Sequence, residues 1–311
     1  MKRGGRYPVF FLDQISFIMT STDAAFEAKL DDLIERALLE DAPAGDHTSL
    51  ACIPPAARCR AALLVKDVGI IAGISIAEKV FKMLDPNCIF KALIQDGQHA
   101  SYGTMAFQIE CNTQALLRAE RVALNLMQRL SGIATFANQF AFEVEDLPVK
   151  ILDTRKTTPT VRFLEKWAVR VGGCYNYRES LSDWFMIKDN HVEACGSVRK
   201  AIEQVAAYQK KLGLNLGVTV EVRNLVELHE VLATGQVNRI MLDNFELPIL
   251  REAVETIDGR FETEASGNIT INNVRRIAQT GVNYISTGAL THSYQSLDLS
   301  LKIIRKKEAK E

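Results

Sequence analysis

From Val149 onward, short apolar runs typical of strands alternate with segments of helical periodicity, and no other feature constrains the fold of this chain as strongly. The expected strands are Val149–Asp153, Phe185–Lys188, Leu216–Val222, Arg239–Asp243, Phe261–Ala265 and Tyr284–Thr287. The expected helices are Arg162–Val171, Val198–Leu212, Val226–Ala233, Pro248–Thr256 and Ile271–Thr280. This alternation predicts βα units around a parallel sheet. About six such units do not require a closed eight-stranded barrel.

The N-terminal part of the chain has a different pattern. Apolar residues at helical spacing predict a helix over Phe26–Leu38. Short strand-like runs follow within residues 58–112, broken by turn sequences and by a helical pattern over Ser75–Leu84. A long helix is expected over Leu117–Phe142. This mixture predicts an α+β layer structure.

We therefore expect two domains. Residues 23–134 form an N-terminal α/β sandwich domain, and residues 135–291 form an α/β barrel domain. Residues 292–311 are expected to pack back on the first domain. Residues 1–22 are expected to be an N-terminal extension, and Met19 is an alternative start because it directly precedes a helix-start sequence, Thr20–Asp23.

Composition argues against several classes of function. The net charge of −1 gives no bulk reason to bind nucleic acid or a membrane surface. The apolar run Pro8–Met19 is interrupted by Asp13 and is too short to span a bilayer. The six cysteines show no CxxC pair, which favours free thiols over disulfides. Free thiols are typical of a reducing compartment, so we expect a cytoplasmic location. The five histidines form no HExxH motif, which argues against a zinc site.

Polar residues follow almost every expected strand. The groups are Thr154-Arg155-Lys156, Lys188-Asp189-Asn190, Glu221 with Arg223, Asp243-Asn244, Ser266-Gly267-Asn268 and Thr287-Gly288. In βα barrels the carboxyl ends of the strands converge on one face, where the active site lies. The sequence therefore predicts one site that gathers residues far apart in the chain.

Both signs of charge are expected in this site. Four cations follow buried-looking runs, which solvated surface charge explains poorly, and they suit carboxylate or phosphate ligands. They are Arg155, Lys156, Arg178 and Lys188. Glu221 and Asp243 end neighbouring strands and are expected to accept hydrogen bonds from sugar hydroxyls or to hold Mg²⁺. The alternative is that these acids only pair with Lys156 and Lys188.

Two glycine-containing loops, at residues 266–270 and 286–293, each lie between an expected strand and a helix start. Small residues there let backbone N–H groups approach a phosphate, and barrels often bind phosphate in their final loops. The alternative for each loop is an ordinary turn with a helix cap. Arg121, after Glu120 on the long helix, either forms a surface pair or enters the site of a neighbouring subunit.

These motifs together resemble a known family, the quinolinate phosphoribosyltransferases, also called carboxylating nicotinate-nucleotide pyrophosphorylases. The resemblance runs from about Ala25 to Lys302 and rests on EDAPAGDHTS (40–49), ERVALNLMQRLSGIAT (120–135), LDTRKTTP (152–159), MIKDNH (186–191), EVRNL (221–225), IMLDNF (240–245), EASGNI (264–269) and STGALTHS (286–293). It implies a sandwich domain followed by an incomplete TIM-like barrel, assembled as a dimer or higher oligomer. It also implies a pentosyltransferase of NAD biosynthesis that, with Mg²⁺, converts quinolinate and phosphoribosyl pyrophosphate to nicotinate mononucleotide, pyrophosphate and CO₂.

The resemblance also implies roles for individual residues. The carboxylates of quinolinate would be bound by Arg155, Lys156, Arg178 and Lys188, with Arg121 contributed by the adjacent subunit. Glu221 and Asp243 would face the ribose hydroxyls and Mg²⁺. The 5′-phosphate would be bound by Ser266, Gly267, Gly288 and His292. Thr154, Tyr177, Asn268 and Thr287 complete the expected substrate-binding set, within which Lys156, Lys188, Glu221 and Asp243 are the expected catalytic residues.

The chain departs from the family pattern mainly in one motif, and Arg223, where many relatives carry an acid, is a milder change. Where the family usually has GGGxxHR, this chain has GGCYNYR, with Cys174 in place of a glycine and Tyr177 in place of a histidine. A phenol can form a hydrogen bond, but it carries no positive charge at neutral pH. Three alternatives therefore stay open. They are a paralogous phosphoribosyltransferase that resembles the molybdenum-transport-associated branch, a Schiff-base lyase or aldolase that uses Lys188, and a non-catalytic binder of phosphorylated sugars.

Overall fold

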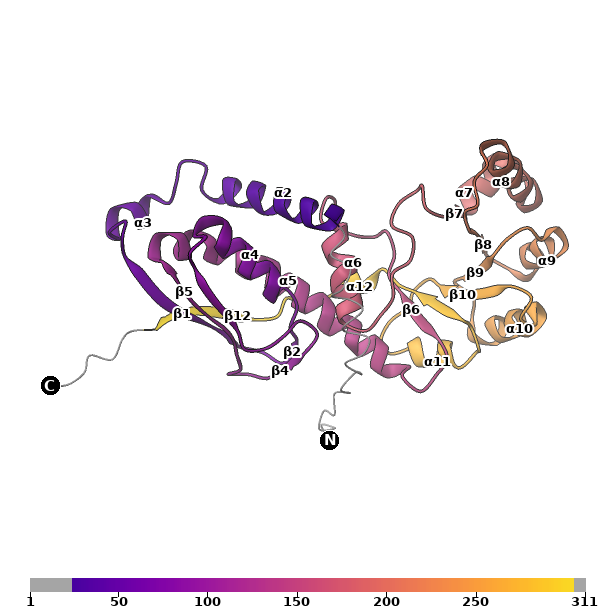
Figure 1. Cartoon of the computed structure of the whole chain (residues 1–311). Helices are drawn as coiled ribbons and strands as arrows, with labels where there is room; N and C mark the ends of the chain where they lie inside the picture. The colour runs from indigo at the N-terminus through magenta and orange to yellow at the C-terminus, as the bar shows by residue number, and fades with distance from the viewer. Residues whose placement is uncertain (1–23, 305–311) are drawn as a thin grey trace, which may run out of the picture. The chain divides into compact units, whose positions relative to one another are not determined.

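The structure is a computed structural model that describes residues 24–304 (Figure 1). The expected N-terminal extension, residues 1–22, and the alternative start Met19 lie outside the described residues. The described chain divides into two compact units. One comprises the chain up to Asn138, Phe163–Gly173 and the chain from Tyr294 onward, and the other comprises Gln139–Arg162 and Cys174–Ser293.

The first unit is built on a four-stranded antiparallel sheet in the order β12-β1-β5-β3. Its strands are β1 (Arg58–Val65), β3 (Ile89–Ala92), β5 (Met105–Asn112) and β12 (Leu299–Ile304). Strand β12 pairs with β1 from Val65↔Leu299 to Arg60↔Ile304, so the end of the described chain returns to the N-terminal sheet. Figure 1 shows it as the yellow strand beside β1. A two-stranded ribbon, β2 (Gly69–Ile70) with β4 (His99–Ala100), completes the strands described in this unit.

Five helices carry residues of this unit: α2 (Ala24–Asp41), α3 (His47–Cys52), α4 (Ile74–Leu84), α5 (Thr113–Glu143) and α6 (Arg162–Val171). Although α6 lies between two barrel strands in sequence, its contacts place most of it here. A Cβ atom on Gly172 would lie 2.4 Å from the backbone oxygen of Ala134, so glycine lets the chain after α6 approach α5 closely. The fully buried Glu165 of α6 forms an ion pair with Arg129 of α5.

The second unit is built on a six-stranded, all-parallel sheet in the order β6-β11-β10-β9-β8-β7. Its strands are β6 (Lys150–Leu152), β7 (Phe185–Ile187), β8 (Val218–Val222), β9 (Arg239–Asp243), β10 (Glu262–Ser266) and β11 (Tyr284–Ser286). The helices are α7 (Asp189–Cys195), α8 (Val198–Leu212), α9 (Leu225–Thr234), α10 (Leu247–Ile257), α11 (Val274–Ala278) and α12 (Ala289–His292). Strands β6 and β7 are the two edges of the sheet, which confirms the expected incomplete barrel.

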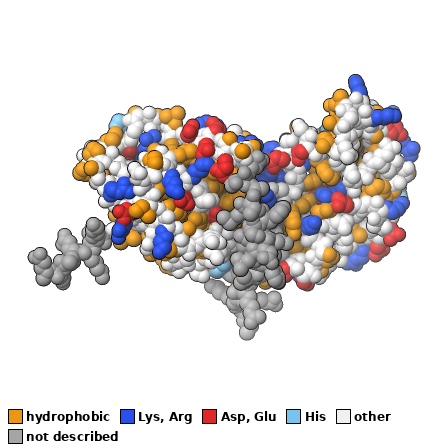
Figure 2. All heavy atoms as spheres, viewed as in Figure 1, with side chains coloured by type: hydrophobic (Ala, Val, Ile, Leu, Met, Phe, Trp, Pro, Cys, Tyr) orange, Lys and Arg blue, Asp and Glu red, His pale blue; other side chains and the backbone are white. Residues whose placement is uncertain are grey.

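The surface fits the near-zero net charge of the chain. Figure 2 shows basic and acidic side chains interspersed with apolar ones on the visible face. Between residues 24 and 304, no helix is both long enough and apolar enough to cross a bilayer.

Candidate active site

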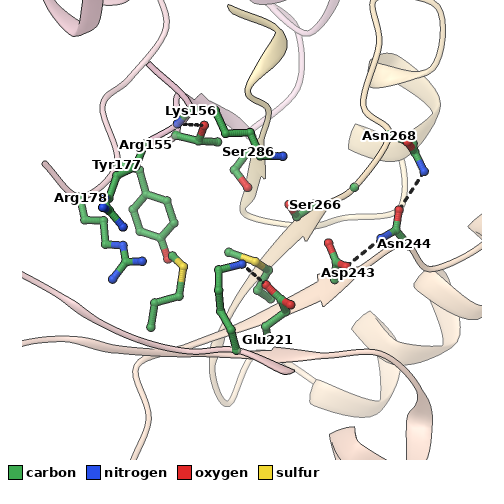
Figure 3. Close-up of a pocket in the computed structure, with 15 residues that line it drawn as sticks. Arg155, Lys156, Tyr177, Arg178, Glu221, Asp243, Asn244, Ser266, Asn268 and Ser286 are labelled. Atoms are coloured by element: carbon green, nitrogen blue, oxygen red, sulfur yellow. Dashed lines mark hydrogen bonds and ion pairs between the residues drawn. The ribbon is translucent and has the colours of Figure 1, made fainter. Parts of the chain in front are cut away.

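A pocket of about 600 Å³ opens at the carboxyl ends of the barrel strands. Its lining comes from all six strands or the residues that directly follow them, and from the segment before β7 (Figure 3). The lining residues are Thr154, Arg155, Lys156, Tyr177, Arg178, Met186, Lys188, Glu221, Met241, Asp243, Asn244, Ser266, Gly267, Asn268 and Ser286. A pocket of this size is typical of small-molecule sites.

One side of the pocket is strongly cationic. Figure 3 shows Arg155, Lys156 and Arg178 together on the side opposite Asp243. Burial lowers the pKa of Arg178, and the positive charge of Arg155 lowers it further. The buried Nε of Arg155 has no hydrogen-bond partner among the described residues. Two guanidinium groups that repel each other, one with a buried donor left unsatisfied, favour the entry of an anion.

This charge arrangement gives a prediction for ligand binding in the absence of any reaction. The family resemblance implies quinolinate as the acid ligand. Quinolinate alone, at about 100 times its dissociation constant, should stabilise the fold by about 2.7 kcal/mol and raise Tm by several degrees. Replacing Arg155 with glutamine should leave the unliganded Tm unchanged or higher, because like-charge repulsion is removed, and should shrink the shift with ligand. Differential scanning fluorimetry measures both. An equal shift in the two proteins would contradict the role of Arg155.

The remaining cation of the predicted set already has a partner. Lys188 Nζ forms an ion pair with Glu221 Oε2, and the side chain of Glu221 is nearly buried. The alternative in which an acid of the site pairs with a lysine is therefore realised for Glu221 with Lys188. This contact holds the Glu221 side chain, and both residues of the pair line the same cavity.

Asp243 is held differently, by a chain of amides. Asn244 Nδ2 donates to Asp243 Oδ2 at 2.7 Å, and Asn268 Nδ2 donates to Asn244 Oδ1 at 3.0 Å. Asn244 and Asn268 both adopt left-handed backbone conformations, with φ of 56° and 50°. Gly267 has φ of +91°, and a Cβ there would lie 2.2 Å from Asn244 Oδ1. Glycine at position 267 therefore leaves the space that the Asn244 side chain occupies and adopts the left-handed backbone without strain.

The acidic side of the pocket has donor atoms of the kind that Mg²⁺ prefers. Glu221 and Asp243 are two carboxylates in one pocket, and Mg²⁺ commonly takes one or two protein carboxylates and completes its shell with phosphates and water. Residues 24–304 contain no group of three or more His, Cys, Asp or Glu side chains suited to hold a metal. The donor set therefore suits shared coordination with a polyphosphate.

Four residues that the sequence predicts for the site lie outside the pocket lining: Arg121, Thr287, Gly288 and His292. Thr287 is buried, and its Oγ1 donates to Ile269 O at 3.3 Å. Gly288 lies against Lys156, since a Cβ at 288 would be 2.7 Å from Lys156 Cδ and 2.9 Å from His292 Nε2. Arg121 is exposed on α5, in the first unit. The phosphate role of 287–292 and the inter-subunit role of Arg121 stay predictions.

The departure at position 177 places a neutral phenol in the pocket wall. The Tyr177 hydroxyl is 2.7 Å from Thr219 Oγ1. The backbone N–H of Tyr177 donates to Asp153 Oδ1 at 2.9 Å. Burial raises the pKa of Tyr177 well above its usual value, and the negative charge of Glu264 adds to this shift. Burial likewise raises the pKa of the Cys174 thiol, which disfavours the reactive thiolate form.

The sequence did not predict two lining residues, Met186 and Met241, whereas Ser286 belongs to the predicted loop 286–293. Met186 and Met241 lie two positions before the predicted Lys188 and Asp243, so the two-residue period of a strand could have identified them. The sequence pattern also grouped Arg223 with Glu221 as polar residues at the end of one strand. Arg223 lies outside the lining, because its guanidinium pairs with Glu227 in the first turn of α9.

The chain matches known proteins along most of its length. The family model for the N-terminal domain of quinolinate phosphoribosyl transferase matches residues 46–131, and the model for the C-terminal domain matches residues 133–302. A Nicotiana tabacum protein named quinolinate phosphoribosyltransferase (decarboxylating) 1b is 46% identical over 289 residues, covering 88% of this chain and 82% of that protein. A Synechocystis protein named probable nicotinate-nucleotide pyrophosphorylase (carboxylating) is 40% identical over 279 residues, covering 89% and 93%.

Solved structures agree with this match. NadC from Streptococcus pyogenes superposes with a TM-score of 0.84 at 39% identity, covering 89% of this chain and 98% of that chain. The nicotinate-nucleotide pyrophosphorylase from Francisella tularensis superposes with a TM-score of 0.83 at 36% identity, covering 89% and 96%. Two family models that together span most of the chain, and relatives above 30% identity, lead to one conclusion: the chain belongs to the quinolinate phosphoribosyltransferase family.

Proposed function

We propose that this chain is a carboxylating nicotinate-nucleotide pyrophosphorylase, a pentosyltransferase of NAD biosynthesis. It transfers the phosphoribosyl group of phosphoribosyl pyrophosphate to quinolinate and releases pyrophosphate and CO₂. The observation that carries the proposal is the pocket itself, in which a cationic wall faces Glu221 and Asp243. The wall consists of Arg155, Lys156 and Arg178, and none of the three forms an ion pair with a carboxylate of residues 24–304. A dicarboxylate and a sugar polyphosphate supply complementary groups to these two sides.

The cationic wall would bind the acid substrate. Arg155 and Arg178 would each hold a carboxylate, and Lys156 and Lys188 would add point charges. We extend the proposal to an assembly of at least two chains, in which Arg121 of a neighbour adds a further cation. The neutral phenol of Tyr177 shapes the wall without adding charge.

The acidic side would orient the ribose. Glu221 and Asp243 would accept hydrogen bonds from the ribose hydroxyls, while Ser266, Gly267 and Asn268 would lie beside the phosphate. The segment at Thr287, Gly288 and His292 would complete the phosphate site next to Lys156. Glu221 and Asp243 would hold Mg²⁺, which when bound would supply positive charge against the departing pyrophosphate.

The reaction then needs positioning and electrostatics more than a nucleophilic side chain. The bond between ribose C1 and pyrophosphate breaks, and the pyridine nitrogen of quinolinate forms the new bond to C1. With the ring nitrogen now cationic, the adjacent carboxylate leaves as CO₂, its bonding electrons stay on the ring carbon, and a proton replaces it. The Schiff-base alternative gains no support, because Lys188 Nζ is already engaged by Glu221.

One assay tests the proposal. Purified chain is mixed with quinolinate, phosphoribosyl pyrophosphate and Mg²⁺, and CO₂ and nicotinate mononucleotide are measured. Quinolinate is expected to be turned over, and nicotinate in its place is expected to react at least about 100-fold more slowly, because one carboxylate contact is lost. Preference for nicotinate or another acid would favour a paralogous transferase. Binding without pyrophosphate release would favour a non-catalytic binder.

We also propose a cytoplasmic location. The six cysteines between Cys52 and Cys195 are all free thiols, as expected in a reducing compartment. A Nicotiana tabacum relative is named as mitochondrial, so cell fractionation of the source organism is the appropriate test.

A further inference from the structure

Tyr177 and Arg178 belong to a segment without helix or strand, between α6 and β7, that is fixed at both ends. Tyr175 bonds to the edge strand β6, donating to Ile151 O at 2.8 Å and accepting from Asp153 N at 3.0 Å. Toward β7, Asp183 accepts from the backbone of Glu179 and Ser180 at 2.7 Å each. A segment with few regular hydrogen bonds needs such anchors to hold a substrate-facing arginine in one position.

A third anchor lies beneath the Tyr177 ring. Arg239, at the start of β9, is buried, and its guanidinium carbon lies 5.0 Å from the centroid of Tyr177 and 5.7 Å from that of Trp184. Tyr284 of β11 covers the guanidinium at 3.7 Å. A guanidinium over aromatic faces in a desolvated site is a strong cation–π arrangement.

The charge of Arg239 is balanced by neighbouring strand β10. Arg239 pairs with Glu262 at 3.0 Å and with the fully buried Glu264 at 3.2 Å. Two residues further along β9, Met241 lines the pocket, and two beyond it lies Asp243. Arg239 thus belongs to the inward-facing row of β9, below the pocket lining.

Thr219 of β8 ties the two ends of the segment together. Its Oγ1 accepts a hydrogen bond from Trp184 Nε1 at 2.8 Å and lies 2.7 Å from the Tyr177 hydroxyl. Trp184 packs on Gly217 so closely that a Cβ there would lie 2.1 Å from the indole ring. Arg178 Nη1, next to Tyr177, in turn donates to the Trp184 backbone oxygen at 3.3 Å.

We propose that Arg239 is a positioning residue for the acid substrate: its guanidinium supports the Tyr177 ring, and the supported ring holds Arg178 toward the pocket. This inference rests on the proposed function and assigns a task to a residue outside the pocket lining. The competing explanation is that Arg239 only neutralises the buried Glu264. The two explanations differ in what happens when both charges are removed together.

The test uses the double variant Arg239→Met with Glu264→Gln, and Glu264→Gln alone as its matched control. The single change Arg239→Met would leave a buried carboxylate unpaired and risk unfolding, whereas the double variant leaves no buried charge at that contact. The double variant is expected to keep its Tm and to raise KM for quinolinate about 10- to 30-fold, with KM for phosphoribosyl pyrophosphate changed less than about threefold. Glu264→Gln alone is expected to keep KM for quinolinate within about threefold. A folded double variant with wild-type KM for quinolinate would overturn the proposal.

A second comparison checks that Arg239 acts through Tyr177. In a Tyr177→Leu background, Arg239→Met with Glu264→Gln is expected to raise KM for quinolinate by less than a further factor of about three. The ring that Arg239 supports is already absent there. If the double change raises KM for quinolinate by the same factor with Tyr177→Leu as without it, the proposal is overturned. If the double variant does not fold, Arg239→Lys keeps the charge and removes the planar face, and an unchanged KM for quinolinate there counts against the proposal equally.

The failure of the proposed function would be distinguishable from failure of this inference. If the wild-type protein shows no turnover of quinolinate, the proposed function fails. The same variants are then compared by the dissociation constant of quinolinate in a thermal titration, with the same 10- to 30-fold change expected.

Discussion

Replacing Arg178 with alanine is expected to lower kcat/KM for quinolinate about 30- to 150-fold, since a lost charge-assisted contact costs about 2–3 kcal/mol. Arg178 lines the pocket beside Arg155, and no carboxylate of the described residues forms an ion pair with either. Arg155→Ala is expected to have an effect of similar size. Steady-state kinetics with varied quinolinate, at saturating phosphoribosyl pyrophosphate, measures both.

Arg223 supplies the matched control. It also follows a barrel strand, but its guanidinium pairs with Glu227 at the exposed start of α9 and lies outside the lining. Arg223→Ala removes the same side chain near the same edge of the sheet, so it should leave kcat/KM within about twofold. Wild-type kinetics in Arg155→Ala and Arg178→Ala, or an equal loss in Arg223→Ala, would refute the assignment of the cationic wall.

The residues of the site could be predicted from the sequence because parallel strands end at one edge. Glu221 and Asp243 are separated in the chain, yet each ends a β-like run, and that alone places both in the same cavity. The hydrogen bonds that hold them could not be predicted. The bond between Asn244 and Asp243 depends on a left-handed backbone at Asn244 and on the empty space at Gly267, which only the packed neighbouring strands define.

The fold shows the same division. The period of apolar residues along the sequence determines which elements form, and packing determines where they lie. The residues of α6 were expected as a helix, but the alternation of strand and helix could not show that most of it packs in the first unit. Its buried residues, such as Leu164 and Ala168, would form an apolar stripe in either place. The sequence indicates Arg239 only as the start of a strand. Its partners Glu262 and Glu264 lie on the next strand and become its neighbours only through the register of the sheet.

Replacing Gly267 with alanine is expected to lower kcat about 100-fold while the protein still folds. The added Cβ would occupy the position of the Asn244 side chain, 2.2 Å from its Oδ1, so Asn244 must move and release Asp243. A displacement of about 1 Å in a group that orients substrate commonly costs about 100-fold in rate. The positive φ of +91° adds a destabilisation of about 1–3 kcal/mol, which urea unfolding would measure.

Gly259 separates these two effects. Its φ is +67°, and a Cβ there would meet nothing within 4 Å, so Gly259→Ala carries a backbone cost without displacing a neighbour. It should lose stability and keep kcat. Adding Asn244→Gly to Gly267→Ala removes the clash and suits the left-handed backbone at 244, so stability should rise while kcat stays low, because Asp243 still lacks its amide donor. Recovery of kcat together with stability would show that Asp243 needs no such donor, and that the glycine serves the fold alone.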